Sequence, residues 1–256
     1  MRPARLAVGV RGVPLERSTG VVLIAHGSRD PRAAAATEAL TRAVADAHPE
    51  WVVRASYLDH AGPRPLDVLT RLEAAGHRRA VLVPVLLTAA YHGKVDVPAV
   101  VTDAHAAGLR LTVDITDVLG PGSATLLDGL IRRLPDADLD AVVLAAAGTR
   151  DAAARATVAD AATALGARLG LPCTVAYASA APPTGAEAVQ RLQAAGARRI
   201  GVAGYFLAPG RLYDGVVASA VSAGAVAVAQ PLGDAPELVR LVEERVYAQT
   251  SGLLAA

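Results

Sequence analysis

Short apolar runs alternate with longer amphipathic stretches along most of this 256-residue chain. In the first half, the strand-length apolar runs are residues 21–25, 51–58, 80–87 and 111–118. The helix-forming stretches between and after them are residues 33–47, 66–75, 96–107 and 123–134. Mostly apolar strands separated by helices indicate parallel βα units, with helices on both faces of the sheet.

Residues typical of helix starts and helix ends support this interpretation. Pro31 stands where the first helix would begin, a position that suits proline because the first helical N–H needs no partner. Gly76 and Gly108 follow the second and third predicted helices, where glycine readily adopts the left-handed backbone that ends a helix.

Two segments of the chain occur twice at nearly the same spacing. Residues 21–30 (VVLIAHGSRD) and 142–151 (VVLAAAGTRD) are identical at seven of ten positions, at an offset of 121. Residues 71–79 (RLEAAGHRR) and 191–199 (RLQAAGARR) are identical at seven of nine, at an offset of 120. The chain therefore contains an internal repeat.

The repeat predicts an α/β protein of two tandem doubly wound parallel-sheet lobes. We expect a flexible leader over residues 1–18, a catalytic lobe over 19–136 and a degenerate second lobe over 137–256. The sequence LPDADLD at 134–140 breaks the pattern and fits a linker between the copies.

Polar side chains follow three strands of the first predicted sheet. His26 and Ser28 come after the first strand, Asp59 and His60 after the second, and the loop containing His92 after the third. In doubly wound sheets, ligands bind beyond the carboxyl ends of the strands, which lie at one edge. These residues are therefore expected to share one cleft.

All six histidines lie in the first copy; they are His26, His48, His60, His77, His92 and His105. The second copy has alanine at the position of His26 and leucine at that of His92, while the neighbouring Gly27, Arg29 and Asp30 are retained. A histidine needed only for packing would be needed in both copies, so the first lobe is expected to carry the chemistry. Arg29 and Asp30 are expected to pair or cap the first helix, and His48, His77 and His105 to lie on the surface.

Two imidazoles and a carboxylate on loops suit a first-row divalent ion such as Fe²⁺, Co²⁺, Ni²⁺ or Zn²⁺. Three protein ligands leave coordination positions open, which an ion in transit requires. The metal is then a substrate, and no tightly bound cofactor is expected. Cys173 is the single cysteine, which excludes an internal disulfide and a cysteine metal cluster.

The charge balance excludes some partners. Twenty-five basic and 24 acidic residues give a net charge of +1, which argues against a general nucleic-acid binder. No apolar stretch has the length of a membrane span or a signal peptide. We expect a cytoplasmic protein that contacts neither nucleic acid nor membrane. A two-lobed monomer is favoured, and a dimer is the alternative.

Two segments carry a resemblance to a known family. LIAHGSRDPR after the first strand and VPVLLTAAYHGKVDVP after the third are similar to the two signature segments of the sirohydrochlorin chelatases. These enzymes insert cobalt in anaerobic cobalamin synthesis or iron in sirohaem synthesis. The resemblance extends from about Thr19 to Pro236. GYFLAPGRLYDGV at 204–216 is similar to the matching segment of the family's long two-lobed members, whose second lobe is degenerate.

The resemblance implies a class II chelatase, a lyase that inserts a divalent metal into a tetrapyrrole. In the family, one histidine of each signature contacts the incoming metal, which points to His26 and His92 here, and one imidazole would accept a pyrrole proton. Asp59 stands where the family more often has glutamate. Fe²⁺ is slightly favoured over Co²⁺, with Ni²⁺ third. Further substrate contacts are expected from Ser28, Arg29, Tyr91, Lys94 and Arg211.

Two other functions stay open at this point. A metal or tetrapyrrole carrier would use the same cleft without turnover. A histidine phosphotransfer enzyme would also place a histidine after a strand, but its strand ends in Arg-His-Gly, and Ala25 occupies the arginine position here.

Overall fold

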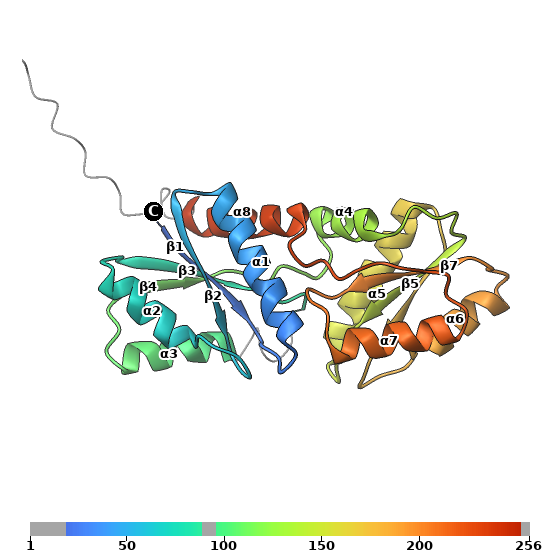
Figure 1. The fold of residues 1–256 in the computed structure, drawn as a ribbon, viewed down its shortest axis with the longest axis horizontal. Coiled ribbons are helices and arrows are strands. Elements are labelled where there is room, and N and C mark those ends of the chain that lie inside the picture. Colours follow the sequence, from blue (N-terminus) through green and yellow to red (C-terminus); the bar gives the residue numbers. More distant parts are fainter. Residues whose placement is uncertain (1–18, 89–95, 252–256) are drawn as a thin grey trace, which may run out of the picture.

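A computed structural model describes residues 19–88 and 96–251 of the chain. The predicted leader and the predicted site residues Tyr91, His92 and Lys94 lie outside the described residues. The described part forms two lobes side by side, each built on a four-stranded parallel sheet (Figure 1).

Both lobes have the same element order. The first repeat contains β1 (Thr19–Ala25), α1 (Pro31–Ala47), β2 (Trp51–Tyr57), α2 (Pro65–Ala74), β3 (Arg79–Pro84), α3 (Val97–Ala106), β4 (Thr112–Ile115) and α4 (Ala124–Arg133). The second contains β5 (Ala141–Ala146), α5 (Ala152–Leu169), β6 (Cys173–Tyr177), α6 (Gly185–Ala194), β7 (Ile200–Tyr205), α7 (Arg211–Ser222), β8 (Ala227–Val228) and α8 (Pro236–Ser251). The strand orders β2-β1-β3-β4 and β6-β5-β7-β8 are equivalent. The predicted fold of two repeated doubly wound lobes is confirmed.

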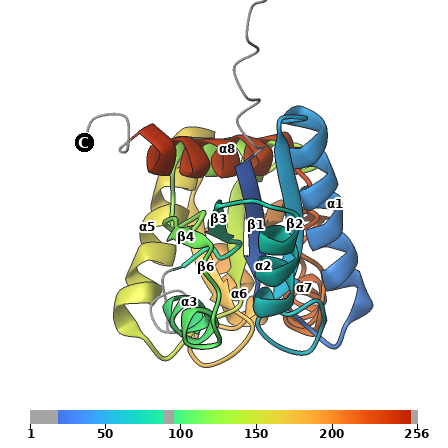
Figure 2. The same cartoon turned by 90° about the vertical axis from the view of Figure 1, so that its left-hand side faces the viewer.

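Each sheet is covered by helices on both faces, as Figure 2 shows for the N-terminal lobe. Alternate residues of β1 face opposite sides: Val21 and Leu23 pack with α1, while Val22 and Ile24 pack with α2 and α3. All four are fully buried, so the strand is apolar along its whole length and does not alternate with polar residues.

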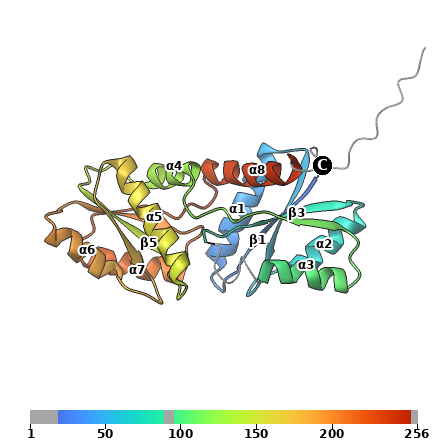
Figure 3. The same ribbon diagram turned by 180° about the vertical axis from the view of Figure 1, so that it is seen from behind.

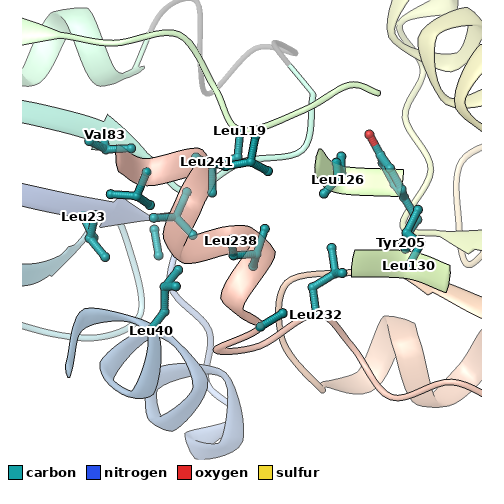
Figure 4. Packing of buried hydrophobic residues seen from close by; sticks show 14 of the residues in the cluster. Leu23, Leu40, Val83, Leu119, Leu126, Leu130, Tyr205, Leu232, Leu238 and Leu241 are labelled. Carbon is teal, nitrogen blue, oxygen red and sulfur yellow. The ribbon is translucent and has the colours of Figure 1, made fainter. Parts of the chain in front are cut away.

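The last helix of each repeat packs on the sheet of the other repeat. α4 contacts α5 and β7, and α8 contacts α1 and β3. Figures 1 and 3 show α8 lying over the first sheet and α4 over the second. In Figure 4, Leu238 and Leu241 of α8 lie among Leu23, Leu40 and Val83. One continuous apolar core therefore extends through both lobes.

Polar contacts also hold α4 and α8, the two helices that pack on the sheet of the other repeat. Arg132 of α4 forms a bidentate ion pair with Glu237 of α8, with N–O distances of 2.9 to 3.1 Å. Gln249 donates to the backbone carbonyl of Ile115 at 3.1 Å. A cut between α4 and β5 would therefore remove a packing helix from each lobe, and the boundary at 136/137 stays a prediction.

The predicted third strand, residues 80–87, is shorter in the structure and ends at Pro84. Val85, Leu86 and Leu87 continue the apolar run as a loop that lines a cavity. Apolar character in this segment comes from the cavity wall as well as from the sheet, and a pattern of hydrophobicity does not distinguish the two.

His48 is not at the surface as expected from the sequence. Its residue surface is 8% exposed, and its ring stacks on that of Trp51 at a centroid distance of 3.9 Å. The end of α1 is covered by α8, whose Tyr247 ring lies 6.2 Å from that of His48. The prediction was wrong because the covering helix comes from the other repeat.

None of the helices in the described ranges is both long enough and apolar enough to span a lipid bilayer.

Candidate active site

A cavity of about 1200 Å³ lies between the carboxyl edges of the two sheets. Its wall comes from the loops after β1, β3, β5 and β7; the main segments are residues 26–30, 85–88, 146–151 and 205–213. In each sheet the first and third strands are neighbours whose connections leave toward opposite faces. This is the place where doubly wound sheets bind ligands, and here two such places face each other.

Two imidazoles meet on the N-terminal wall. The ring centroids of His26 and His60 are 6.2 Å apart and the rings are almost perpendicular, at 86°. Both residues line the cavity. They come together because β1 and β2 are paired up to Ala25 and Tyr57, and the ladder continues with the N–H of Asp59 donating to the carbonyl of His26 at 2.8 Å.

A left-handed backbone conformation occurs in both loops that carry these histidines. Gly27 has φ +92°, and a Cβ there would lie 1.8 Å from the carbonyl oxygen of Asp59, so only glycine fits. His60 is itself left-handed, at φ 60°. The second lobe repeats this geometry with Gly148 at φ 87° and Ala180 at φ 66°. Both lobes therefore share the shape of this loop, and only the first lobe has the two imidazoles on it.

Asp59 lies behind His60. Its Oδ1 accepts from the backbone N–H of His60 at 2.8 Å, and its Oδ2 is 3.4 Å from Nε2 of that ring. Arg64 is 3.6 Å from Oδ1. The hydrogen bond from the His60 backbone is the main influence that lowers the pKa of Asp59, so its carboxyl is ionised at neutral pH. Among the described residues, His60 lines the cavity and Asp59 does not.

Arginines and a hydroxyl stand around the cavity. Arg29, Arg150 and Arg211 line it with exposed side chains, two of them from the C-terminal lobe. Ser28 also lines the cavity, and its Oγ accepts from the backbone N–H of Asp30 at 3.0 Å. Asp30 and Asp151 also line the cavity, and each accepts backbone hydrogen bonds at the start of a helix. The three guanidinium groups can bind carboxylates of a ligand.

Asp30 caps α1, as expected from the sequence, by accepting from the backbone N–H of Arg32 at 3.0 Å. Its ion pair in the structure is with Arg32, at 2.6 Å. The same Arg32 guanidinium also reaches Asp214 on α7, again at 2.6 Å. This second contact joins the two lobes beside the cavity.

The far wall is apolar and aromatic, formed by Tyr205, Phe206 and Tyr213. The Tyr205 hydroxyl lies between the lobes: it donates to the carbonyl of Leu87 at 3.1 Å and also contacts the carbonyl of Pro121. Burial raises the pKa of Tyr205, so it stays a neutral donor. The cavity thus combines an apolar wall with three arginines at its rim and a pair of imidazoles.

Of the residues predicted from the sequence, the structure brings His26, Ser28, Arg29 and Arg211 to one cavity. His92, Tyr91 and Lys94 lie outside the described residues, so their part in the site stays a prediction. In residues 19–88 and 96–251, no group of three or more His, Cys, Asp or Glu side chains is close enough to hold a metal ion.

The sequence predicts His60 in the same cleft from its place after the second strand, and His60 lines the cavity. Sequence reasoning did not include Arg150 and the aromatic wall in the site. Arg150 matches Arg29 in the repeat and became a candidate only once the two sheets were seen to face each other. The aromatic wall likewise depends on how the lobes are arranged.

The comparison with protein families shows to which family this chain belongs. The model of the CbiX family matches residues 20–137 and, a second time, residues 141–249. This chain belongs to the CbiX family. The two matches coincide with the two sequence repeats, so both halves of this CbiX protein derive from the same unit.

Relatives of this CbiX chain include a protein from Methanococcoides burtonii named sirohydrochlorin cobaltochelatase, 26% identical over 73 residues. That match covers 28% of the chain and 56%, about half, of the relative. Among solved structures, SirB from Bacillus subtilis with Fe³⁺ has a TM-score of 0.77 at 20% identity, covering 92% of this chain and 98% of its own. SirB from Bacillus subtilis subspecies spizizenii with cobalt has a TM-score of 0.73 at 19% identity, covering 90% and 94%. A CbiX described as the terminal enzyme for biosynthesis of siroheme in denitrifying bacteria has a TM-score of 0.61 at 19% identity, covering 90% and 98%. These structural similarities show that the two-lobed CbiX fold is shared over nearly the whole chain.

Proposed function

We propose that this protein is a sirohydrochlorin chelatase, which inserts a divalent metal ion into a tetrapyrrole. The observation that carries this proposal is the pair of facing imidazoles at one wall of the cavity between the two CbiX repeats. The cavity volume of about 1200 Å³ exceeds the roughly 300–1,000 Å³ typical of small-molecule pockets. A bulky ligand suits this space.

In this proposal the N-terminal lobe handles the metal. His26 binds the ion from the β1 loop, with His92 as the second imidazole of the family's signatures and Asp59 as the carboxylate of the site. A small number of protein ligands leaves coordination positions open for the nitrogens of the macrocycle. Insertion displaces two pyrrole protons, and a neutral imidazole can accept one of them.

The arginine rim and the aromatic wall hold the tetrapyrrole. Arg29, Arg150 and Arg211 are placed to bind peripheral carboxylates, which a guanidinium can contact through two hydrogen bonds. Phe206 and Tyr213 offer apolar surface to the macrocycle. Ser28, Tyr91 and Lys94 complete the proposed contacts.

We propose Fe²⁺ as the physiological metal, for sirohaem, with Co²⁺ close behind and Ni²⁺ third. Imidazole and carboxylate ligands accept all three ions, so ligand type alone separates them little. Both iron and cobalt occur in the names of the structural relatives. We further propose that the protein works as a monomer, because one chain supplies both walls of the cavity. We also propose that it works in the cytoplasm.

The decisive experiment follows the absorbance of sirohydrochlorin under anaerobic conditions, with purified protein and Fe²⁺, Co²⁺ or Ni²⁺ in turn. We expect turnover to a metallated product, and near-complete loss of turnover in His26→Ala. His77→Ala serves as the matched control, because His77 precedes β3 and lies at the opposite edge of the sheet.

Two results would contradict the proposal. Binding of tetrapyrrole or metal without a metallated product would make the protein a carrier. Near-normal turnover in a folded His26→Ala variant would remove the assigned metal site.

A further inference from the structure

We infer that His60 is a further metal ligand of the N-terminal lobe and that Asp59 acts through it as a positioning residue. This inference rests on the proposed function, because it concerns how the same site receives its ion. It starts from the juxtaposition of His26 and His60 in the cavity wall.

The distance between the rings fits a shared ion. With metal–nitrogen bonds of about 2.0–2.1 Å, two imidazoles on one metal have ring centroids roughly 4.5 Å apart when the two bonds meet at a right angle and roughly 6.4 Å apart when they are opposite each other. The centroids of His26 and His60 are 6.2 Å apart.

Asp59 supplies the orienting contact. A histidine that binds a metal through one ring nitrogen usually donates the other N–H to a carboxylate or carbonyl. Nε2 of His60 lies 3.4 Å from Oδ2 of Asp59, within the distance of an ion pair. The other ring nitrogen, Nδ1, is then the metal-binding one. Asp59 contributes to the site through the ring of His60.

The second lobe provides an internal comparison. Ala147 and Ala180 occupy the positions of His26 and His60, and Ser179 occupies that of Asp59. The backbone is conserved in detail, since the N–H of Ser179 donates to the carbonyl of Ala147 at 3.1 Å and Ala180 has φ 66°. The loop therefore folds without either imidazole or the carboxylate. The second lobe lacks all three groups together, as expected for groups that serve one ion.

The test measures Co²⁺ binding to the full-length protein without tetrapyrrole, by calorimetry and by the visible absorption of the bound ion. Removal of an outer-sphere partner costs about 10–100-fold in metal affinity, so loss of a direct ligand should cost at least about tenfold. We expect that loss in His60→Ala, together with a changed Co²⁺ spectrum. Ala180 shows that alanine fits this backbone. His60→Asn provides a second variant, because asparagine tolerates a left-handed φ.

The double variant separates positioning from direct binding. Asp59→Asn should weaken Co²⁺ binding and shift its spectrum when His60 is present, but change neither in the His60→Ala background. His77→Ala should bind Co²⁺ like the wild type. Wild-type affinity in both His60 variants would overturn the inference, as would a wild-type protein that binds no Co²⁺. An equal effect of Asp59→Asn in both backgrounds would overturn the role of Asp59.

A parallel metallation assay keeps the two proposals distinct. If the wild type metallates sirohydrochlorin while the His60 variants bind Co²⁺ normally, only the inference about His60 fails. If the wild type binds Co²⁺ through His60 yet forms no metallated product, the chelatase function fails and the metal site stands.

Discussion

Gly27 connects the fold directly to the candidate site, so Gly27→Ala should damage both stability and turnover. At φ +92°, the added Cβ would stand 1.8 Å from the carbonyl oxygen of Asp59. Real Cβ atoms essentially never come closer than 3.0 Å to a heavy atom outside their own and the adjacent residues. The loop after β2 would have to move by the difference, about 1.2 Å. That loop carries His60, which faces His26.

The expected stability loss has two parts. An alanine held in the left-handed region costs about 1–2 kcal/mol. Displacement of Asp59 also breaks the bond from its N–H to the carbonyl of His26, which contributes about 1 kcal/mol. A total of about 2–3 kcal/mol corresponds to a fall in Tm of roughly 4–12 °C for a chain of this size.

Two other glycines separate these contributions. Gly108 has φ +98° with nothing within 4 Å of a built Cβ, so Gly108→Ala should show the backbone cost alone. Gly148 has φ +87°, and its Cβ would lie 2.0 Å from the carbonyl oxygen of Ser179. Gly148→Ala should therefore match Gly27→Ala in stability.

Activity should distinguish the two lobes. A misplacement of about 1 Å in a catalytic group can cost roughly 10²-fold in rate, and we expect a loss of that order in kcat for Gly27→Ala below its Tm. Gly148→Ala should alter at most the KM for the tetrapyrrole, because its loop carries no imidazole. Thermal unfolding monitored by circular dichroism, together with the metallation assay, measures both effects. Equal losses of kcat in the two variants would refute the assignment of the chemistry to the N-terminal lobe.

Two contacts between the lobes yield further predictions. Glu237→Gln should destabilise the protein by about 1–2 kcal/mol, a modest value because Arg132 is half exposed. The ion pair lowers the folded-state pKa of Glu237 below 4.5; its contribution is thus full above pH 4.5 and lost as the pH falls through the folded pKa. Urea titrations should find wild type and variant converging in acid, and a constant difference would contradict the ion pair. Arg32→Ala should lower Tm slightly at low salt and not in 1 M salt, because its pair with Asp214 is exposed and screened; a salt-independent effect would point to packing instead.

The amino-acid sequence by itself determined the elements and their repetition. Hydrophobic periodicity and helix-ending residues act within a few positions, so Pro31 and Gly76 predicted a helix boundary without any tertiary contact. The repeat then predicted that both sheets have one topology. Because parallel strands end at the same edge, the sequence also indicated that His26 belongs to a ligand site.

Only the tertiary structure decided how the lobes face each other. The exchange of α4 and α8 depends on apolar packing between residues more than 100 positions apart, such as Leu23 and Leu238, which belong to one buried cluster. The local pattern of either helix does not encode its partner. The same arrangement brings Arg150 and the aromatic wall to the first lobe's cavity. The sequence predicted His60 in the cleft, but the short distance between its ring and that of His26 depends on a left-handed backbone at His60 and on the pairing of two neighbouring loops.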